Sequence, residues 1–517
     1  MSLFEEASLY LFSSPLTRLE CTHRWAQIAV KHDHPSALSA YRTAINLLPQ
    51  LAALNLDLRL RQQLLTTRSG TNLASGAATC AVGLGQYTTA VELLEASRSV
   101  FWSQALRLRT PLDIVAIDNP QLASRISTLA SDLEQAAFRD ARRNLASNKQ
   151  HEAISIELEG EHYQRLNADL LQAIASVPGL SDFMQPKSIT VLKQSAVHGP
   201  VVILNPGESS SQALLVQYSG QVQCVPLPDI SVYSVELLVK LLHALLSQST
   251  FDLIEFMTMT KNSRGDSTAT QALLGLEARL LVFQVDLSPQ KSPNPPRLWW
   301  CPVGPMSFLP IHAAGIYSMH DKDCVSEYII SSYTPTLAAL LNPPNHPNAQ
   351  FKMTAVIQPE SKFGAPLPGT RTELKNIQGR VPKQWLTSLG DTTPATVATT
   401  RVHLQDSSIV HFACHGIQDE TNTLDCGLAL TDDLLKISDI MQKLEKPASE
   451  EKSMALAFLS ACETAKGDLQ VPDEAMHLAA TLLFAGFHGV VGTMWSVHIF
   501  DTREFQTLTF WKVDGRS

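Results

Sequence analysis

The spacing of apolar positions along the chain changes near residue 200. Over residues 1–150, small and aromatic residues recur at helical intervals, as at Ala37, Tyr41 and Ala44, whereas from Val201 onward the apolar residues form short continuous runs. Helical intervals place apolar side chains on one face of a helix, and short apolar runs bounded by turn residues are typical of buried strands. The pattern predicts a helical first part followed by an α/β part.

The apolar runs of the second part predict its strands. A buried strand is expected at 201–204, followed by a hairpin in which residues 213–218 and 221–225 flank Ser219-Gly220, and then by a helix at 235–246. Residues 251–296 are the least legible stretch, with a polar part at 255–268 and a proline-rich part at 288–296. Further sheet strands are expected at Leu298–Val303, Lys352–Gln358, Ser408–Ala413, Met454–Ala461 and Gly489–Met494. Because strands that alternate with helices form parallel sheets, we expect a mostly parallel, doubly wound sheet.

Composition narrows the class of protein. A chain of 517 residues allows two or more domains, and 44% hydrophobic with 17% charged residues predicts a packed globular protein. The formal net charge of −9 and the lack of a basic stripe argue against a nucleic-acid partner. No Gly-x4-Gly-Lys-Ser/Thr motif for ATP is present.

Cysteine usage and the apolar segments predict a cytoplasmic location. The eight cysteines are spread singly, as in proteins with reduced thiols. Glu5 and Glu6 stand where a signal peptide would be basic. The apolar stretch 478–495 contains His488 and three glycines, so we expect a core helix and strand there and no membrane partner.

Two segments of the first part resemble helices of tetratricopeptide repeats. One contains residues 37–48 and ends at Pro49, and the other contains Ala78 and Ala90, whose separation of 90 − 78 = 12 is that between the two small positions of such a repeat. The two segments are 90 − 37 = 53 residues apart rather than the regular interval of about 34, so an irregular helical bundle is the alternative. The helical pattern continues over residues 98–108. Stacked helix pairs would form a concave surface for a peptide or a partner protein.

Two of the predicted strands end in groups that can react with a carbonyl. The run 408–413 is followed by Cys414-His415-Gly416, and the run 454–461 by Cys462. Active sites of open α/β sheets lie at the carboxyl ends of the strands, so we expect His415 and Cys462 to face each other at the ends of adjacent parallel strands. Their separation of 462 − 415 = 47 residues is close to the caspase interval of about 50. A thiolate can attack a carbonyl and an imidazole can transfer its proton, whereas a buried structural thiol is the alternative for Cys462.

Other polar residues near these strands have simpler interpretations. His411 is expected to be a core residue, and alternation along the strand points Cys414 into the core, away from His415. The spacing of these residues to Cys426 fits no zinc site. The remaining candidates are Trp299 and Trp300 as core residues, Arg371 and Glu373 as surface charges at a helix start, and Asp473 and Glu474 as acids at a helix N-terminus. A sharper alternative is that Asp473 and Glu474 line a pocket for a basic substrate side chain.

The motifs together resemble the CHAT family of caspase- and separase-like cysteine peptidases. The resemblance rests on His-Phe-Ala-Cys-His-Gly at 411–416 and Leu-Ser-Ala-Cys-Glu-Thr-Ala at 459–465, and on the segments 297–302, 308–315, 367–370 and 485–495. It implies a caspase-like three-layer α/β/α domain with a mostly parallel sheet over residues 186–517, after a helical tetratricopeptide-like domain at 1–185. Only residues 497–517 follow the last motif, fewer than the helix and strand that family members have there, so the resemblance also predicts a shortened C-terminus.

The same resemblance implies a cysteine endopeptidase without metal or organic cofactor. Cys462 would attack the scissile carbonyl, His415 would protonate the leaving amine, and the N–H groups of Gly416 and Cys462 would form the oxyanion hole. The helical half would recruit a protein substrate or bind a protein regulator. The alternative is an inactive scaffold that keeps the fold and binds partners.

Overall fold

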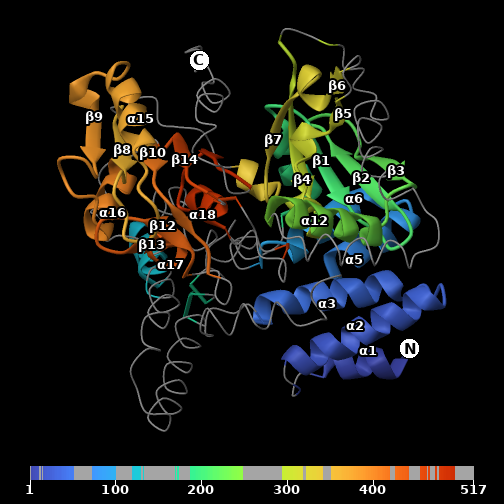
Figure 1. Ribbon diagram of the computed structural model, residues 1–517. Coiled ribbons are helices and arrows are strands. Elements are labelled where there is room, and N and C mark those ends of the chain that lie inside the picture. Colours follow the sequence, from blue (N-terminus) through green and yellow to red (C-terminus); the bar gives the residue numbers. More distant parts are fainter. Residues whose placement is uncertain are drawn as a thin grey trace. The chain divides into compact units, whose positions relative to one another are not determined.

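The computed structural model of the chain divides into two compact units. The first unit comprises Met1–Asn342 and Gly467–Ala475, and the second comprises Pro343–Lys466 and Met476–Ser517 (Figure 1). The described residues are 2–10, 13, 15–51, 73–100, 119–129, 132, 169–170, 172–173, 187–247, 291, 294–317, 322–341, 351–419, 425–441, 454–462, 464–465, 472–473 and 477–494. Most of the polar segment 251–296 and the C-terminal residues 495–517 lie outside these ranges.

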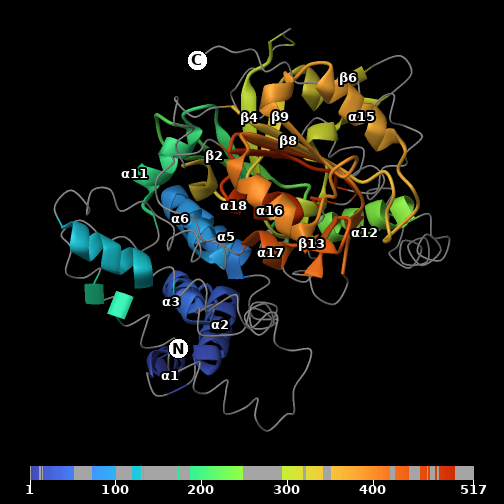
Figure 2. The ribbon, with the colours of Figure 1, turned by 90° about the vertical axis from the view of Figure 1, so that its left-hand side faces the viewer.

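Helices of the first unit pack in pairs. Their bounds are α1 Ser2–Leu9, α2 Pro15–Lys31, α3 Ala37–Leu51, α5 Leu73–Gly83 and α6 Tyr87–Ser97. α2 packs on α3 and α5 packs on α6 (Figure 2). Ala40, Ala44, Ala77 and Ala78 are fully buried, which lets neighbouring helix axes approach closely. The helical character of this part is confirmed, whereas the tetratricopeptide-like repeat stays a prediction.

The predicted continuation of the helix over residues 98–108 is wrong at Arg98 and Ser99, and residues 101–108 lie outside the described residues. α6 ends at Ser97, Arg98 is extended with φ −113° and ψ 150°, and Ser99 has a positive φ of 49°. A positive φ is strained for a residue other than glycine and needs support from its surroundings. Here the N–H of Ser99 donates to the carbonyl of Asp473 at 2.8 Å. This turn directs the chain out of the helix at the position where Arg98 enters the core.

The first sheet is mixed. Its order is β3-β2-β1-β4-β7, formed by β1 Val201–Asn205, β2 Ser211–Val216, β3 Gln223–Leu227, β4 Arg297–Pro302 and β7 Ile330–Tyr333. β1 and β2, and β2 and β3, pair antiparallel, which confirms the hairpin, whereas β4 pairs parallel with β1 and with β7. Val201 and Ile203 join the core of the N-terminal helices, and Val202 and Leu204 face Val235 of α12 (Val232–Ser247). Alternation along β1 therefore ties this sheet to the helices of the first unit. The domain boundary at 185/186 stays a prediction.

The second sheet is entirely parallel. Its order is β15-β14-β10-β8-β9, formed by β8 Met353–Ile357, β9 Leu386–Leu389, β10 Ile409–Ala413, β14 Leu456–Ser460 and β15 Gly489–Val491. Helix α15 (Gly369–Gln378) lies on one side, and α16 (Val397–Asp406) and α18 (Leu478–Phe484) lie on the other (Figure 2). The expected parallel sheet is confirmed, but the strand at 297–302 is not part of it. The apolar pattern of a strand does not specify which sheet it joins.

Several shorter α-helices and strands also lie in the described ranges. They are α11 Ile189–Leu192, β5 Gly315–Tyr317, β6 Lys322–Cys324, β11 Gly416–Ile417, β12 Gly427–Ala429, β13 Leu434–Lys436 and α17 Ile437–Met441. β11, β12 and β13 form a small antiparallel sheet that begins directly after His415.

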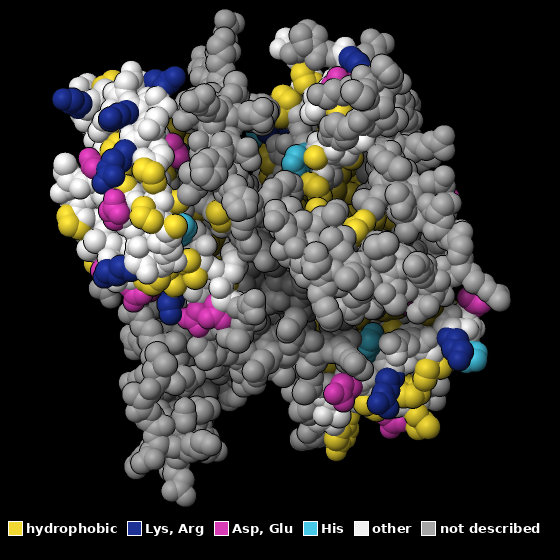
Figure 3. All heavy atoms as spheres, in the orientation of Figure 1, with side chains coloured by type: hydrophobic (Ala, Val, Ile, Leu, Met, Phe, Trp, Pro, Cys, Tyr) yellow, Lys and Arg dark blue, Asp and Glu magenta, His cyan; other side chains and the backbone are white. Residues whose placement is uncertain are grey.

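The surface carries charges of both signs with apolar side chains between them. Along α1 and α2, Leu3 and Val30 are exposed among charged residues, and basic and acidic side chains are interspersed over the second unit (Figure 3). Among the described helices, none has both the length and the apolar character needed to span a bilayer.

Candidate active site

His415 and Cys462 follow the carboxyl ends of two neighbouring strands. In the parallel pair β10–β14, Ala413 lies opposite Ser460, and each candidate residue lies two positions beyond that pair (Figure 1). The apolar cores of both strands fix this register, because Val410, Phe412, Ala457 and Leu459 are almost completely buried. The two strand ends are therefore adjacent at the same edge of the sheet, as expected from the sequence.

Gly416 brings the histidine loop against the backbone of Cys462. A Cβ added at Gly416 would overlap the carbonyl oxygen of Cys462 and lie 3.5 Å from its nitrogen. On the other side, the carbonyl of His415 accepts from the N–H of Ala429 at 2.9 Å. Only glycine fits between these two backbone segments, so Gly416 fixes how closely the two loops approach.

A backbone carbonyl orients the His415 ring. Nε2 of His415 lies 2.7 Å from the carbonyl oxygen of Ala365. A carbonyl oxygen only accepts, so Nε2 carries the proton and, in the neutral ring, Nδ1 holds the lone pair. The neighbouring Gly364 leaves room for the ring, because a Cβ there would lie 2.7 Å from Nε2.

The loop that carries Cys462 is pinned to the end of β15. Thr493 Oγ1 donates to the carbonyl of Ala461 at 2.7 Å, and the N–H of Ala465 donates to the carbonyl of Thr493 at 2.8 Å. The N–H of Thr493 in turn donates to Thr464 Oγ1 at 3.0 Å. These bonds hold the backbone on both sides of Cys462, whose side chain is partly exposed.

Glu373 is not the surface charge that the sequence predicted. Its Oε2 lies 2.9 Å from His411 Nε2, and its Oε1 accepts from Ser460 Oγ at 3.3 Å. The His411 ring is stacked on Phe458 with centroids 5.1 Å apart, so His411 is a partly buried partner of Glu373 rather than a plain core residue. Arg371, by contrast, is half-exposed and pairs with Glu360 at the surface, as predicted. No spacing rule in one sequence links a helix acid to a strand histidine 38 residues later.

Cys414 is buried, so its thiol is not a candidate nucleophile at the strand ends. Burial, and then the charges of Glu373 and Cys462, raise the pKa of its thiol well above the usual range. This confirms its predicted core position. In the part of the chain that is described, no three His, Cys, Asp or Glu side chains are grouped to hold a metal ion.

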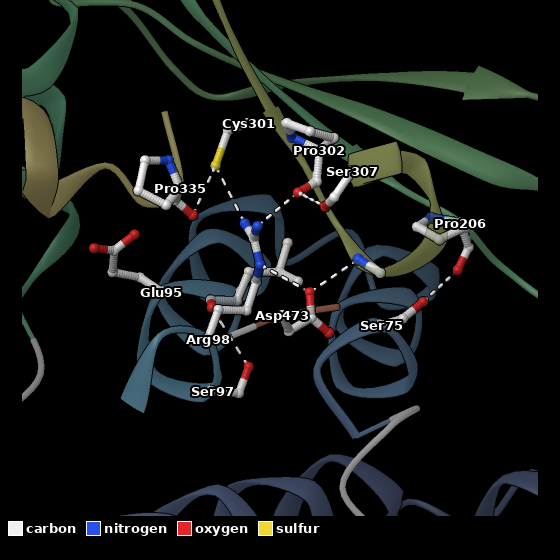
Figure 4. Close-up of polar contacts among 12 residues, drawn as sticks. Ser75, Glu95, Ser97, Arg98, Pro206, Cys301, Pro302, Ser307, Pro335 and Asp473 are labelled. Carbon is white, nitrogen blue, oxygen red and sulfur yellow. Dashed lines mark hydrogen bonds and ion pairs between the residues drawn. The ribbon is translucent and has the colours of Figure 1, made fainter. Parts of the chain in front are cut away.

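Asp473 makes internal contacts within the first unit. Its Oδ1 accepts from Arg98 Nε at 3.1 Å and from the N–H of Gly304 at 2.9 Å (Figure 4). Arg98 also donates to the carbonyl of Pro302 at 2.6 Å and contacts Cys301 Sγ at 3.2 Å. The carboxylate is thus already engaged, so these contacts give the predicted pocket role of Asp473 no support. Glu474 lies outside the described residues.

A buried charge network surrounds Arg98. Burial alone would lower the pKa of its guanidinium, but the neighbouring Cys301 and Asp473 raise it, so the group is held charged. Burial raises the pKa of Glu95, whereas hydrogen bonds from Ala338 and Leu337 act in the opposite direction. Arg98 is the cation that offsets these acidic neighbours.

His477 begins the helix that follows the cysteine loop. Its Nδ1 accepts from the N–H of Ala480 at 3.1 Å, as an N-cap of α18. Burial lowers the pKa of His477 to about 4, and a backbone hydrogen bond at Thr464 acts in the opposite direction. The ring is therefore neutral near pH 7 and can keep accepting this bond.

The fold and this edge together define an α/β protein with a candidate thiol site at the carboxyl ends of a parallel sheet. Residues 268–510 match the family model described as the CHAT domain, so the chain contains a CHAT domain. The match includes both strand-end motifs and leaves the N-terminal helices outside. A search of curated proteins found no match.

Proposed function

We propose that this chain is a cysteine endopeptidase in which Cys462 is the nucleophile and His415 the proton carrier. The observation that carries the proposal is the seating of Gly416 against the Cys462 backbone, where a Cβ would overlap the carbonyl oxygen. Two loops from neighbouring strands, one bearing an imidazole and the other a thiol, are thereby held together at the edge where α/β proteins bind substrates.

The reaction follows from the positions of the donors. His415 Nδ1 accepts the proton of the Cys462 thiol, and the thiolate forms a bond to the scissile carbonyl carbon. The N–H groups of Gly416 and Cys462 donate to the oxyanion. As the C–N bond breaks, His415 returns its proton to the leaving amine. Water then loses a proton to His415 and attacks the thioester, which releases the acid and restores the thiol.

The remaining parts of the chain fit the same proposal. The parallel sheet between α15 and the pair α16 and α18 supports the proposed caspase-like layer arrangement. The helix pairs α2–α3 and α5–α6 would recruit a protein substrate or a regulator through a tetratricopeptide-like surface. No metal or organic cofactor takes part in the reaction as written.

An electrophilic peptide probe tests the proposal directly. We expect a peptide acyloxymethyl ketone to label Cys462 ahead of the other seven cysteines, because an activated thiolate reacts faster than a protonated thiol. Mass spectrometry of the digested protein identifies the labelled residue. Labelling that follows side-chain exposure alone would contradict the proposal and favour an inactive scaffold.

Gly364→Ala is expected to impair cleavage by displacing the His415 ring. The new Cβ would lie 2.7 Å from Nε2 and 2.9 Å from Cε1, so the ring must move from the Ala365 carbonyl. A displacement of this kind lowers kcat/KM by about 10- to 100-fold. The measurement is steady-state cleavage of a peptide that has the same amino-acid sequence as a probe that labels Cys462.

Gly369→Ala is the matched control for this substitution. A Cβ at Gly369 meets nothing within 4 Å, and the residue lies in the first turn of α15. We expect its kcat/KM to equal that of the wild type. Equal activity in both alanine variants would show that the His415 position does not govern the reaction.

A further inference from the structure

Glu373 uses both carboxylate oxygens on the two strands that end at the candidate site. Oε2 pairs with His411 of β10 at 2.9 Å, and Oε1 accepts from Ser460 of β14 at 3.3 Å. The carboxylate is 23% exposed and the His411 side chain 12%, so the pair is shielded from solvent more than an ordinary surface ion pair. A carboxylate bonded at both oxygens has its orientation fixed.

The strand register places these contacts directly before the reactive thiol. His411 lies opposite Phe458, and Ala413 lies opposite Ser460. Residues 411 and 413 share one face of β10, and residues 458 and 460 share the same face of β14. Ser460 is two residues before Cys462. The hydrogen bond between the Ser460 hydroxyl and Glu373 therefore holds the end of the strand that presents the thiol.

The same segment of chain also holds the histidine. Ala365, which accepts from His415 Nε2, is only eight residues before Glu373 (373 − 365 = 8). The link between them is ordered by the N–H of Leu367 donating to the carbonyl of Pro359 at 2.9 Å and by Thr370 Oγ1 donating to the carbonyl of Leu367 at 2.8 Å. Leu374 anchors α15 in the core with Ala355 and Ala413.

We infer that Glu373 is a positioning residue that sets the geometry of Cys462 through Ser460, while Ala365 on the same segment sets that of His415. The inference rests on the proposed function for its effect on catalysis. His411 contacts Oε2 of the carboxylate and stacks on Phe458, which keeps Glu373 directed at the two strands rather than at solvent. The segment 364–373 thus adjusts both reactive groups together, as an outer shell of contacts does in a precise site.

The test compares Glu373→Ala with Glu373→Gln. Glutamine keeps an oxygen that can accept from Ser460, loses the charge, and presents an amide N–H to His411 Nε2 where Glu373 presents Oε2. The hydrogen bond to Ser460 that carries the positioning therefore survives in it. We expect amide exchange at Ala465, whose N–H bonds Thr493, to be about 10-fold faster in Glu373→Ala and near wild type in Glu373→Gln. For peptide cleavage, kcat should fall by about 10- to 100-fold in Glu373→Ala with KM little changed.

Two further variants make the result specific. Ser460→Ala removes the other partner of the bond and should give the same faster exchange without altering α15. Glu360→Ala is the matched control. The Glu360 side chain is 74% exposed, and its ion pair with the half-exposed Arg371 is long, at 3.8 Å. This variant should leave amide exchange and kcat unchanged. Thermal unfolding of each variant confirms that the compared proteins are folded.

The outcomes separate this inference from the proposed function. Exchange at Ala465 that is equal in Glu373→Ala and Glu360→Ala overturns the inference, whatever the activity. Equal losses in Glu373→Gln and Glu373→Ala also overturn it, because the charge rather than the bond would then be required. Faster exchange in a protein whose wild type neither cleaves peptides nor labels at Cys462 supports the positioning and refutes the peptidase.

Discussion

Cys462→Ala is expected to abolish peptide cleavage and leave the fold intact. The reaction has no route to a thioester without a nucleophile at this position, and alanine supplies none. The substitution removes one partly exposed sulfur at a strand end, so the free energy of unfolding should change by about 1 kcal/mol or less. Cleavage of a probe-selected peptide and urea unfolding are the two measurements.

Cys224→Ala provides the comparison for this variant. Cys224 is a partly buried residue of β3 in the first sheet and has no part in the proposed reaction. We expect it to retain wild-type cleavage. If Cys462→Ala cleaves at the wild-type rate, Cys462 is not the nucleophile, and another group carries the cleavage.

Arg98→Met is expected to be the most destabilising change in the first unit. Methionine keeps much of the apolar stem but leaves the Asp473 carboxylate without its cation and the Pro302 carbonyl without its donor. The Arg98 side chain is 5% exposed and that of Asp473 16%, and breaking a buried pair from one side costs about 3–5 kcal/mol. Urea unfolding should show this loss in the transition of the first unit.

Two variants distinguish a lost ion pair from a general packing defect. Arg98→Met combined with Asp473→Asn removes both charges of the pair and should recover part of the lost free energy, since Asp473 no longer leaves a carboxylate without its cation. Arg371→Met breaks two exposed ion pairs, with Glu360 and with Asp391, and should cost less than about 1 kcal/mol. Equal destabilisation by Arg98→Met and Arg371→Met would mean that the buried network contributes no more than a surface pair.

The sequence predicted the local elements of the site well because their signals are short in range. Val410 and Phe412 alternate toward the core as a strand requires, and Cys414 follows the same alternation into the interior. The turn residues after each run marked where the strands end. These features depend on neighbours within a few positions, which one sequence contains.

Contacts between distant segments could not be predicted in the same way. Glu373 has the composition of any exposed helix residue, and only the register of β10 with β14 brings His411 and Ser460 to it. The strand at 297–302 has the same apolar pattern whichever sheet it joins. Arg98 was assigned to a continuing helix, since the turn at Ser99 depends on support from Asp473.

The two residues of the Arg98–Asp473 pair are made at different times during synthesis on the ribosome. The two residues are 375 positions apart, and translation at about 5–20 residues per second separates their appearance by about 20–75 s. During that interval the nascent first unit holds a cation whose carboxylate has not yet been made. The contacts that join Asp473 to Arg98 and to the N–H of Gly304 therefore form only after residue 473 has been translated, long after the N-terminal helices have been made.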